Sequence, residues 1–112
     1  VSKSNLNRLQ KLPIDVIVCG KNQVNLTKLL SILSKKGIKT ILLEGGGTLN
    51  RSFLKKNLID EMIIALTPYV LGSKNTVSLF EGMSFPDLKT KLPLKLKNIQ
   101  KSENEIILNY KF

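Results

Sequence analysis

The sequence contains no histidine and no tryptophan, and it has a single cysteine, Cys19. Without histidine, a Ser-His-Asp triad, a histidine-activated cysteine and the usual zinc ligand sets are all excluded. One cysteine cannot form a disulfide within the chain, and it fits a protein of the reducing cytoplasm. Any chemistry must therefore use carboxylates, lysines, hydroxyl groups, backbone amides or a bound cofactor, and we expect no metal site.

Acidic side chains are scarce. The chain has 8 Asp and Glu residues against 18 Lys and Arg residues, which gives a formal net charge of +10 at pH 7. Such an excess favours anionic partners, namely phosphates, nucleotides or nucleic acid. However, the lysines are scattered along the whole chain, whereas nucleic-acid surfaces more often concentrate arginine or combine aromatic side chains with the charge. We expect phosphorylated ligands and no nucleic acid, and a basic nucleic-acid binder is the alternative suggested by the charge alone.

Long hydrophobic runs are also missing. No apolar run approaches the roughly 20 residues that a membrane-spanning helix needs, and the polar residues 1–12 lack the apolar segment of a signal peptide. We therefore expect no membrane partner. With 112 residues, the chain is expected to form a single domain, 1–112.

Apolar periodicity predicts that helices and strands alternate along the first two thirds of the chain. The expected helices are residues 4–12, 25–37 and 48–57. The expected strands are the apolar, largely β-branched runs at 14–19, 38–44 and 59–71. The middle helix has Asn25 as a suitable N-cap and Gly37 just beyond its last turn. Because strands alternate with helices, we predict parallel βαβ units.

The pattern changes toward the C-terminus. Residues 72–93 are irregular and are interrupted by glycine and proline. Residues 94–101 and 105–112 are expected to pair as an antiparallel hairpin. The predicted fold class is therefore α/β, with a mixed sheet that combines parallel βαβ units and a C-terminal antiparallel hairpin.

Three adjacent glycines, Gly45, Gly46 and Gly47, separate the predicted strand 38–44 from the helix that follows. Without Cβ atoms, this backbone can adopt positive φ angles and approach a ligand closely. The helix N-terminus adds unpaired N–H groups and a partial positive charge, so the turn favours phosphate binding. A tight turn with no ligand is the alternative. The dinucleotide fingerprint G-x-G-x-x-G does not match, because Asn50 stands where its last glycine is required.

Glu44 ends the strand that precedes the glycines. In open α/β sheets, ligands bind at the carboxyl ends of the strands. A carboxylate accepts two hydrogen bonds and therefore suits sugar hydroxyls, whereas it repels a neighbouring phosphate. We therefore expect Glu44 to contact a second, hydroxyl-bearing ligand, and a solvated acid is the alternative.

Three motifs in a fixed order, EGGGTLN at 44–50, LIDEM at 58–62 and TPYVLG at 67–72, resemble the C-terminal half of the riboflavin-pathway pyrimidine reductases. These proteins share a fold with dihydrofolate reductase. The resemblance implies a reaction in which NADPH gives a hydride to C1′ of a ribosylamino-pyrimidine 5′-phosphate and the ribose opens into a ribityl chain. It also implies a homodimer. The diamino and the deaminated pyrimidine both stay open as substrates.

By position, the resemblance implies that Glu44 contacts the sugar of the substrate. No proton donor is apparent among the residues, so we assign no catalytic residue. The resemblance implies that the phosphates of NADPH are held by Gly46, Gly47, Thr48, Leu49, Asn50, Arg51 and Ser52. Because the family's domain is longer than this chain, 1–112 is expected to be the C-terminal half of a reductase domain. A non-catalytic nucleotide-binding or assembly fragment of the same fold is the alternative.

Overall fold

The computed structural model describes residues 2–72, 76–83 and 94–112. Within these ranges the chain forms three helices and three strands, and it divides after Leu42 into two compact units. Among the described residues, no helix has the length and apolar character required to cross a membrane. The α/β class predicted from the sequence is confirmed at this level.

The first unit contains α1, Lys3–Leu9, and α2, Leu26–Lys35. The α2 helix begins at the predicted cap, because the side chain of Asn25 accepts a hydrogen bond from the Lys28 N–H at 3.0 Å. At its other end Gly37 has a φ of +83°. The N–H groups of Gly37 and Ile38 donate to carbonyl groups of the last turn at 2.9 and 3.1 Å. These paired hydrogen bonds form the Schellman motif that glycine permits.

The segments 14–19 and 38–44, predicted as strands, are not strands in this structure. Their apolar side chains are largely exposed, 80% in the case of Leu42, although Cys19 is buried with 6% exposure. A strand is maintained by ladder hydrogen bonds to a neighbouring strand, and no described strand pairs with either segment. The predicted parallel βαβ units are therefore not present in the described residues.

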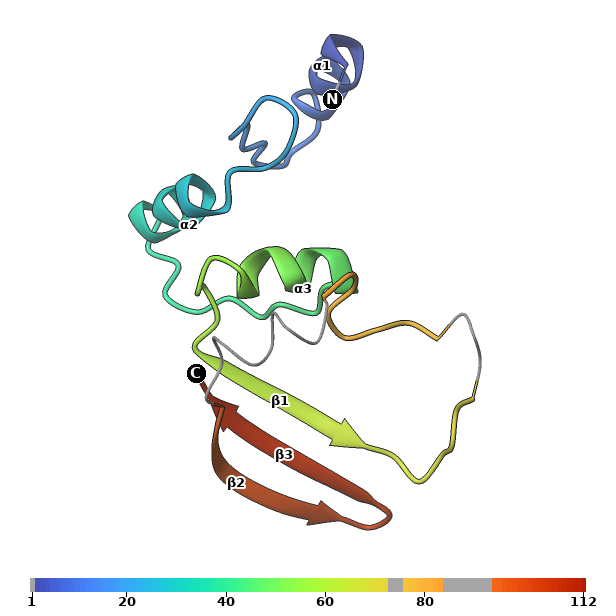
Figure 1. Cartoon of the computed structure of the whole chain (residues 1–112). Coiled ribbons are helices and arrows are strands. Elements are labelled where there is room, and N and C mark those ends of the chain that lie inside the picture. The colour runs from blue at the N-terminus through green and yellow to red at the C-terminus, as the bar shows by residue number, and fades with distance from the viewer. Residues whose placement is uncertain (1, 73–75, 84–93) are drawn as a thin grey trace. The chain divides into compact units, whose positions relative to one another are not determined.

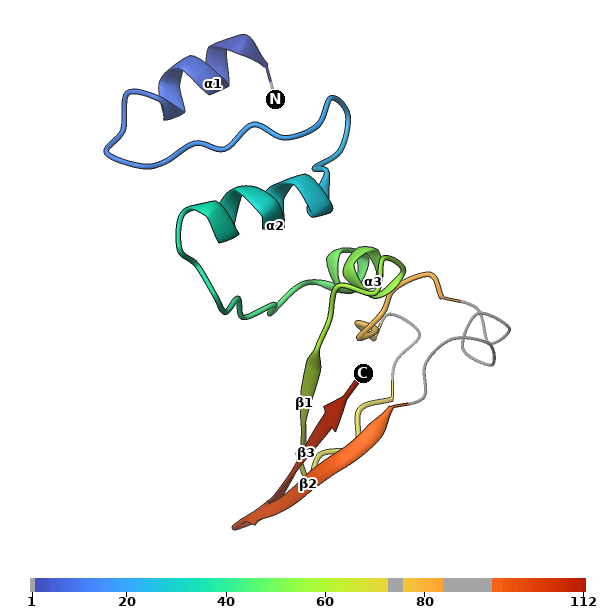
Figure 2. The same cartoon turned by 90° about the vertical axis from the view of Figure 1, so that its left-hand side faces the viewer.

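The second unit contains α3, Gly47–Leu54, and the strands β1, Glu61–Leu66, β2, Lys95–Ser102, and β3, Glu105–Lys111. The strands form one sheet in the order β1-β3-β2 with both pairings antiparallel. Figure 1 shows β3 between the other two strands, and the three stay side by side in the turned view of Figure 2. The predicted C-terminal hairpin is confirmed.

The register of the sheet separates its two faces. Met62 lies opposite Tyr110, and Ile64 lies opposite Leu108, so apolar side chains share one face because side chains alternate along a strand. All four of these residues are half-buried. The buried apolar residues described in this unit are Phe53 and Leu54 on α3.

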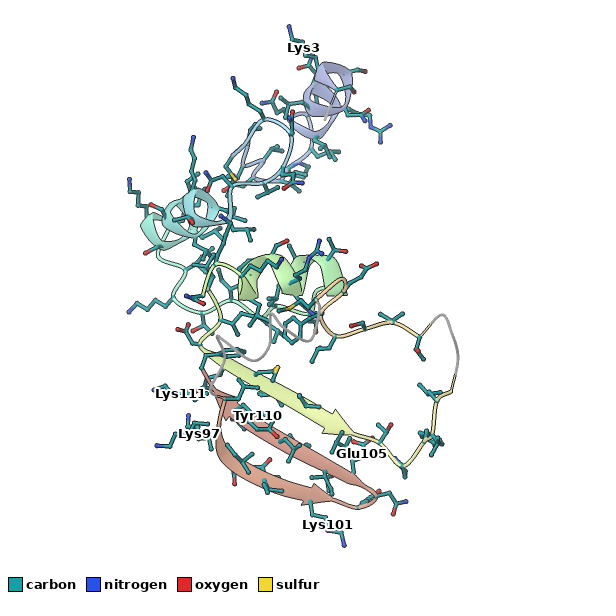
Figure 3. The ribbon with its side chains drawn as sticks, viewed as in Figure 1. Lys3, Lys97, Lys101, Glu105, Tyr110 and Lys111 are labelled. Carbon is teal, nitrogen blue, oxygen red and sulfur yellow. The ribbon has the colours of Figure 1, made fainter. Side chains whose placement is uncertain are left out.

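A β-bulge interrupts the pairing of β2 with β3 between Leu96 and Asn98, which makes Lys97 the extra residue. The Lys97 Nζ donates to the Glu61 Oε1 on β1 at 2.7 Å. Figure 3 shows Lys97 and Lys111 at one end of the sheet and Lys101 near the hairpin turn. The hydrogen bond from Lys97 holds the pKa of the Glu61 carboxyl below its ordinary value.

Candidate phosphate-binding turn

The turn before α3 has the backbone conformation that its glycines were expected to permit. Gly45 and Gly46 have φ angles of +73° and +89°, which L-residues with side chains rarely adopt. Gly46 is the N-cap of α3 and provides no side-chain cap. A Cβ built on Gly46 would find no atom within 4 Å, so the backbone here borders open space.

The first turn of α3 keeps backbone donors available. The N–H groups of Leu49 and Asn50 both donate to the Gly46 carbonyl at 3.0 Å. Within the part of the chain that the structure describes, no hydrogen bond involves the N–H of Gly47 or Thr48. Unpaired N–H groups at a helix N-terminus form a site for an anion, and here they follow the open backbone of Gly46.

The loop 76–83 lies against the same helical turn, which the sequence did not predict (Figure 1). The Thr48 hydroxyl donates to the Glu81 Oε2 at 2.5 Å. The Asn50 Nδ2 donates to the Leu79 carbonyl at 3.0 Å. The Arg51 Nη1 donates to the Gly82 carbonyl at 3.4 Å. The polar side chains expected to bind phosphate therefore bind a loop of the same chain.

Gly47 is needed for this packing. A Cβ at Gly47 would lie 2.5 Å from the Ser78 carbonyl oxygen and 2.8 Å from the Glu81 backbone nitrogen. Such short distances to backbone atoms cannot be relieved by a rotamer change, so the loop would have to move. Of the three adjacent glycines, Gly47 therefore serves loop packing, whereas Gly46 borders open space.

The remaining predicted site residues, Ser52, Leu49 and Glu44, have no described hydrogen bond with the loop 76–83. The Ser52 hydroxyl donates to the Thr48 carbonyl at 2.8 Å within the helix. The Leu49 side chain is 43% exposed. Glu44, the predicted substrate contact, is exposed and directly precedes the glycine turn. The structure thus places all of these residues on one turn and helix, with the backbone as the available donor.

Asn50 is the one buried polar residue among those predicted to bind the cofactor, with an exposure of 9%. Its amide nitrogen must face the Leu79 carbonyl, because that carbonyl only accepts. The Oδ1 is thereby directed to Gly45, where a built Cβ would lie 2.0 Å away, and Oδ1 has no hydrogen-bond partner. The protein's own described groups leave a buried acceptor unsatisfied beside the turn, which folded proteins seldom allow.

No group of three or more acidic or cysteine side chains that could hold a metal ion occurs among the described residues. Cys19 is a buried free thiol in the other unit. Within the described ranges, the glycine turn combines the unpaired N–H groups of Gly47 and Thr48 with the open space beside Gly46.

Comparison with known proteins gives this turn a family context. The model of the RibD C-terminal domain matches residues 1–108. The chain belongs to this family. The resemblance inferred from the motifs at 44–50, 58–62 and 67–72 is thereby confirmed.

Curated relatives of this RibD C-terminal domain are named as pyrimidinone 5′-phosphate reductases or as riboflavin biosynthesis proteins. The chain is 34% identical over 96 residues to the 2,5-diamino-6-ribosylamino-4(3H)-pyrimidinone 5′-phosphate reductase of Aquifex aeolicus, with 86% of this chain and 43% of the relative covered. It is 29% identical over 107 residues to the riboflavin biosynthesis protein RibD of Actinobacillus pleuropneumoniae, covering 94% and 28%. The chain therefore spans less than half the length of these relatives.

Solved structures agree on the fold of the RibD C-terminal domain. RibD of Acinetobacter baumannii matches with a TM-score of 0.71 and 28% identity, over 99% of this chain and 29% of that protein. A pyrimidine reductase-like protein of Corynebacterium diphtheriae matches with a TM-score of 0.77 over 96% of this chain and 43% of that one. At 24% identity, the second likeness concerns the fold alone.

Proposed function

We propose that this chain carries the NADPH-binding part of a reductase that converts a ribosylamino-pyrimidine 5′-phosphate into its ribitylamino form in riboflavin biosynthesis. Family membership supports the reaction class, since relatives are named as reductases of this type. The observation that carries the cofactor part is the open turn at Gly46, followed by the N–H groups of Gly47 and Thr48.

The turn fits the phosphates of a dinucleotide through its backbone. Gly46 presents no side chain to an approaching group, and the N–H groups of Gly47 and Thr48 would donate to phosphate oxygens. Arg51 adds a cation on the same helix. When bound, NADPH would supply the hydride for the reduction. Glu44, exposed at the start of the turn, would accept hydrogen bonds from the ribose hydroxyls of the substrate and orient its sugar.

We also propose that the complete reductase domain has the dihydrofolate reductase-like mixed sheet, with 14–19 and 38–44 as parallel strands. The β-branched composition of these segments and the exposure of Leu42 and Val18 support this proposal. We propose that the functional oligomer is a homodimer and that the protein is located in the cytoplasm. The family resemblance supports the dimer, and the single free cysteine, Cys19, supports a reducing compartment.

Substituting Gly46 tests the cofactor site. A Cβ at Gly46 would enter the open space beside the turn and strain a φ of +89°, so Gly46→Ala should weaken NADPH binding at least about tenfold, which corresponds to about 1.4 kcal/mol. Gly37→Ala is the matched control, because Gly37 has a φ of +83° and also borders open space. Calorimetric titration of both variants measures the effect. Equal affinity in the two variants would contradict the proposed site.

A turnover assay separates the reductase from its alternative, a non-catalytic nucleotide-binding fragment of the same fold. The 112-residue chain is incubated with NADPH and either the diamino or the deaminated ribosylamino-pyrimidine 5′-phosphate. NADPH consumption with formation of the ribityl product establishes the enzyme and identifies its substrate. Turnover by the 112-residue chain alone would rule out the non-catalytic alternative, whereas NADPH binding without turnover is expected if the chain is the cofactor-binding part of a longer reductase domain.

A further inference from the structure

A row of charged side chains crosses one end of the described sheet. Glu61 on β1 lies opposite Lys111 on β3, and Lys111 in turn lies opposite Lys95 on β2. Residues that are directly opposed in antiparallel strands place their side chains on the same face of the sheet. Lys111 therefore has a carboxylate on one side and a second ammonium group on the other.

The β-bulge adds a third lysine to this row. Lys97 is the extra residue between Leu96 and Asn98, and its Nζ donates to the Glu61 Oε1 at 2.7 Å. Because β3 lies between β1 and β2, the Lys97 side chain reaches across β3 on the face that carries Glu61. Figure 3 shows Lys97 and Lys111 together at this end of the sheet.

The lysines of the row outnumber the carboxylate that they share. Three ammonium groups and one carboxylate give the row a side-chain charge of +2. The hydrogen bond and the charge of Lys97, and more weakly the charge of Lys111, lower the pKa of Glu61. Lys95 forms no ion pair with a described residue. Like charges that are opposed across strands destabilise a sheet, so the row is weakened unless an anion lies between the lysines.

The row is accessible, and its donors suit a phosphate group. Lys95 and Lys111 are exposed, and the side chains of Lys97 and Glu61 are 54% and 46% exposed. An ammonium group is a compact charge with three rotatable donors and is a common phosphate ligand. Carboxylate ligands are better matched by the planar guanidinium group of arginine, which this row lacks.

The positive charge is confined to one end of this face. Farther along it, Ile63 and Ala65 on β1 lie opposite uncharged residues of β3. Glu105 places an acid at the hairpin end of the same face, because it is separated from Lys111 by an even number of residues along β3. A nucleic-acid backbone is bound through cations at several successive phosphates. The short row therefore fits a single phosphate group of a small molecule.

We propose that Lys95, Lys97 and Lys111 form a binding site for the phosphate group of a small phosphate monoester. The phosphate lies between the opposed ammonium groups of Lys95 and Lys111, and Lys97 donates to it while it remains anchored to Glu61. The site belongs to the sheet and uses no residue of the glycine turn before α3, so it does not depend on the proposed function.

Inorganic phosphate is the probe that tests the three lysines. It is titrated into the 112-residue chain at neutral pH and low ionic strength, and the amide shifts of residues 95–98 and 109–111 report the affinity. Lys95→Gln and Lys111→Gln should each weaken binding by roughly three- to tenfold, which is the Coulomb effect of one charge about 6 Å from a phosphate dianion in a solvated site. Lys101→Gln is the matched control, because Lys101 lies opposite Ile106 on the other face of the sheet. Equal affinity in all three variants would overturn the inference.

Glu61→Gln should change the affinity in the opposite direction. The glutamine oxygen can still accept from Lys97, whereas the negative charge that repels phosphate is lost. Phosphate binding should therefore become about three- to tenfold stronger. Glu105→Gln is the control, since it removes an acid at the far end of the same face, and it should leave the affinity unchanged. Unchanged or weaker binding in Glu61→Gln would contradict the site.

Two further observations separate a site from general attraction to a basic protein. Ribose 5-phosphate, a monoester, should shift the same amides as inorganic phosphate, and a failure to shift them would overturn the assignment to a monoester. Residues 28–36 of the first unit contain Lys28, Lys35 and Lys36 without such a row. Shifts of equal size at 28–36 would show that phosphate follows the net charge of the chain, and the proposed site would then be wrong.

Discussion

The two units of this chain contain similar apolar runs, yet a sheet forms in one of them alone among the described residues. The segment 14–19 in the first unit and the segment 38–44, which crosses the division after Leu42, are rich in Ile, Val and Leu but pair with no described strand. In the second unit, β2 and β3 pair through a short hairpin, and β1 pairs with β3. An antiparallel hairpin obtains its partner from adjacent sequence, whereas a parallel strand needs one from a distant crossover. The hairpin of β2 and β3 is local, whereas β1 pairs with a strand far along the chain, and the segments 14–19 and 38–44 pair with no described strand.

The largest expected effect comes from removing a buried side chain of the second unit. Leu54 on α3 is 3% exposed, and Leu54→Ala should lower the free energy of unfolding by about 2–5 kcal/mol, because it removes buried methyl groups and leaves a cavity. Hydrogen exchange at the amides of β1 and β3 measures the loss. Leu49→Ala on the same helix is the matched control and should cost less than about 1 kcal/mol, since Leu49 is 43% exposed. Equal costs in the two variants would contradict a core position for Leu54.

An intermediate effect is expected at the end of α2 in the first unit, where the stabilising interactions are local. Gly37→Ala forces a Cβ into a φ of +83° and should destabilise the helix by about 1 kcal/mol. Hydrogen exchange at the amides of residues 33–38 measures the change. Gly72→Ala is the control, because Gly72 borders open space without a positive φ. An unchanged exchange rate at Gly37 and Ile38 would mean that the Schellman hydrogen bonds do not limit fraying.

The smallest effect is expected from the exposed ion pair between Glu61 and Lys97. The pKa of Glu61 is lowered by the hydrogen bond from Lys97, so the pair stabilises the folded state above the unfolded-state pKa of Glu61. This stability is lost as the pH falls through the lower pKa of the folded state. Glu61→Gln should therefore reduce the loss of stability between about pH 5 and pH 3. Denaturant unfolding at several pH values measures it. Lys97→Ala should have the same effect, and a slope unaltered in both variants would contradict the assignment.

The ends of α2 and the C-terminal hairpin can be predicted from the sequence, because short stretches of neighbouring residues determine them. The α2 helix has its cap at Asn25 and its terminating glycine at Gly37, both as predicted. The hairpin of β2 and β3 also follows from adjacent sequence. Residues 14–19 and 38–44 were predicted as strands from composition alone. Composition measures compatibility with a sheet and does not provide the neighbouring strand.

For the candidate site, the sequence predicts the backbone conformation of the glycine turn but not its contacts with the loop 76–83. The positive φ angles of Gly45 and Gly46 follow from the absence of side chains. The contact between Thr48 and Glu81 was not predicted, because these residues are 33 positions apart and nothing in the sequence pattern pairs them. For the same reason, the sequence does not predict that the Asn50 amide nitrogen donates to the Leu79 carbonyl. Loop-to-helix packing depends on tertiary structure, which short motifs do not encode.

The two outer strands of the described sheet differ in how readily a further strand could add to them. Along β2, Lys95, Lys97 and Lys101 place positive charge on the outer strand, and the bulge at Lys97 distorts its line of hydrogen-bonding groups. Charged lysines and bulges discourage the edge-to-edge pairing that leads to aggregation. The residues of β1 between Glu61 and Leu66 are Met62, Ile63, Ile64 and Ala65, without lysine. The sheet thus has one edge that resists the addition of a strand and one that lacks this protection.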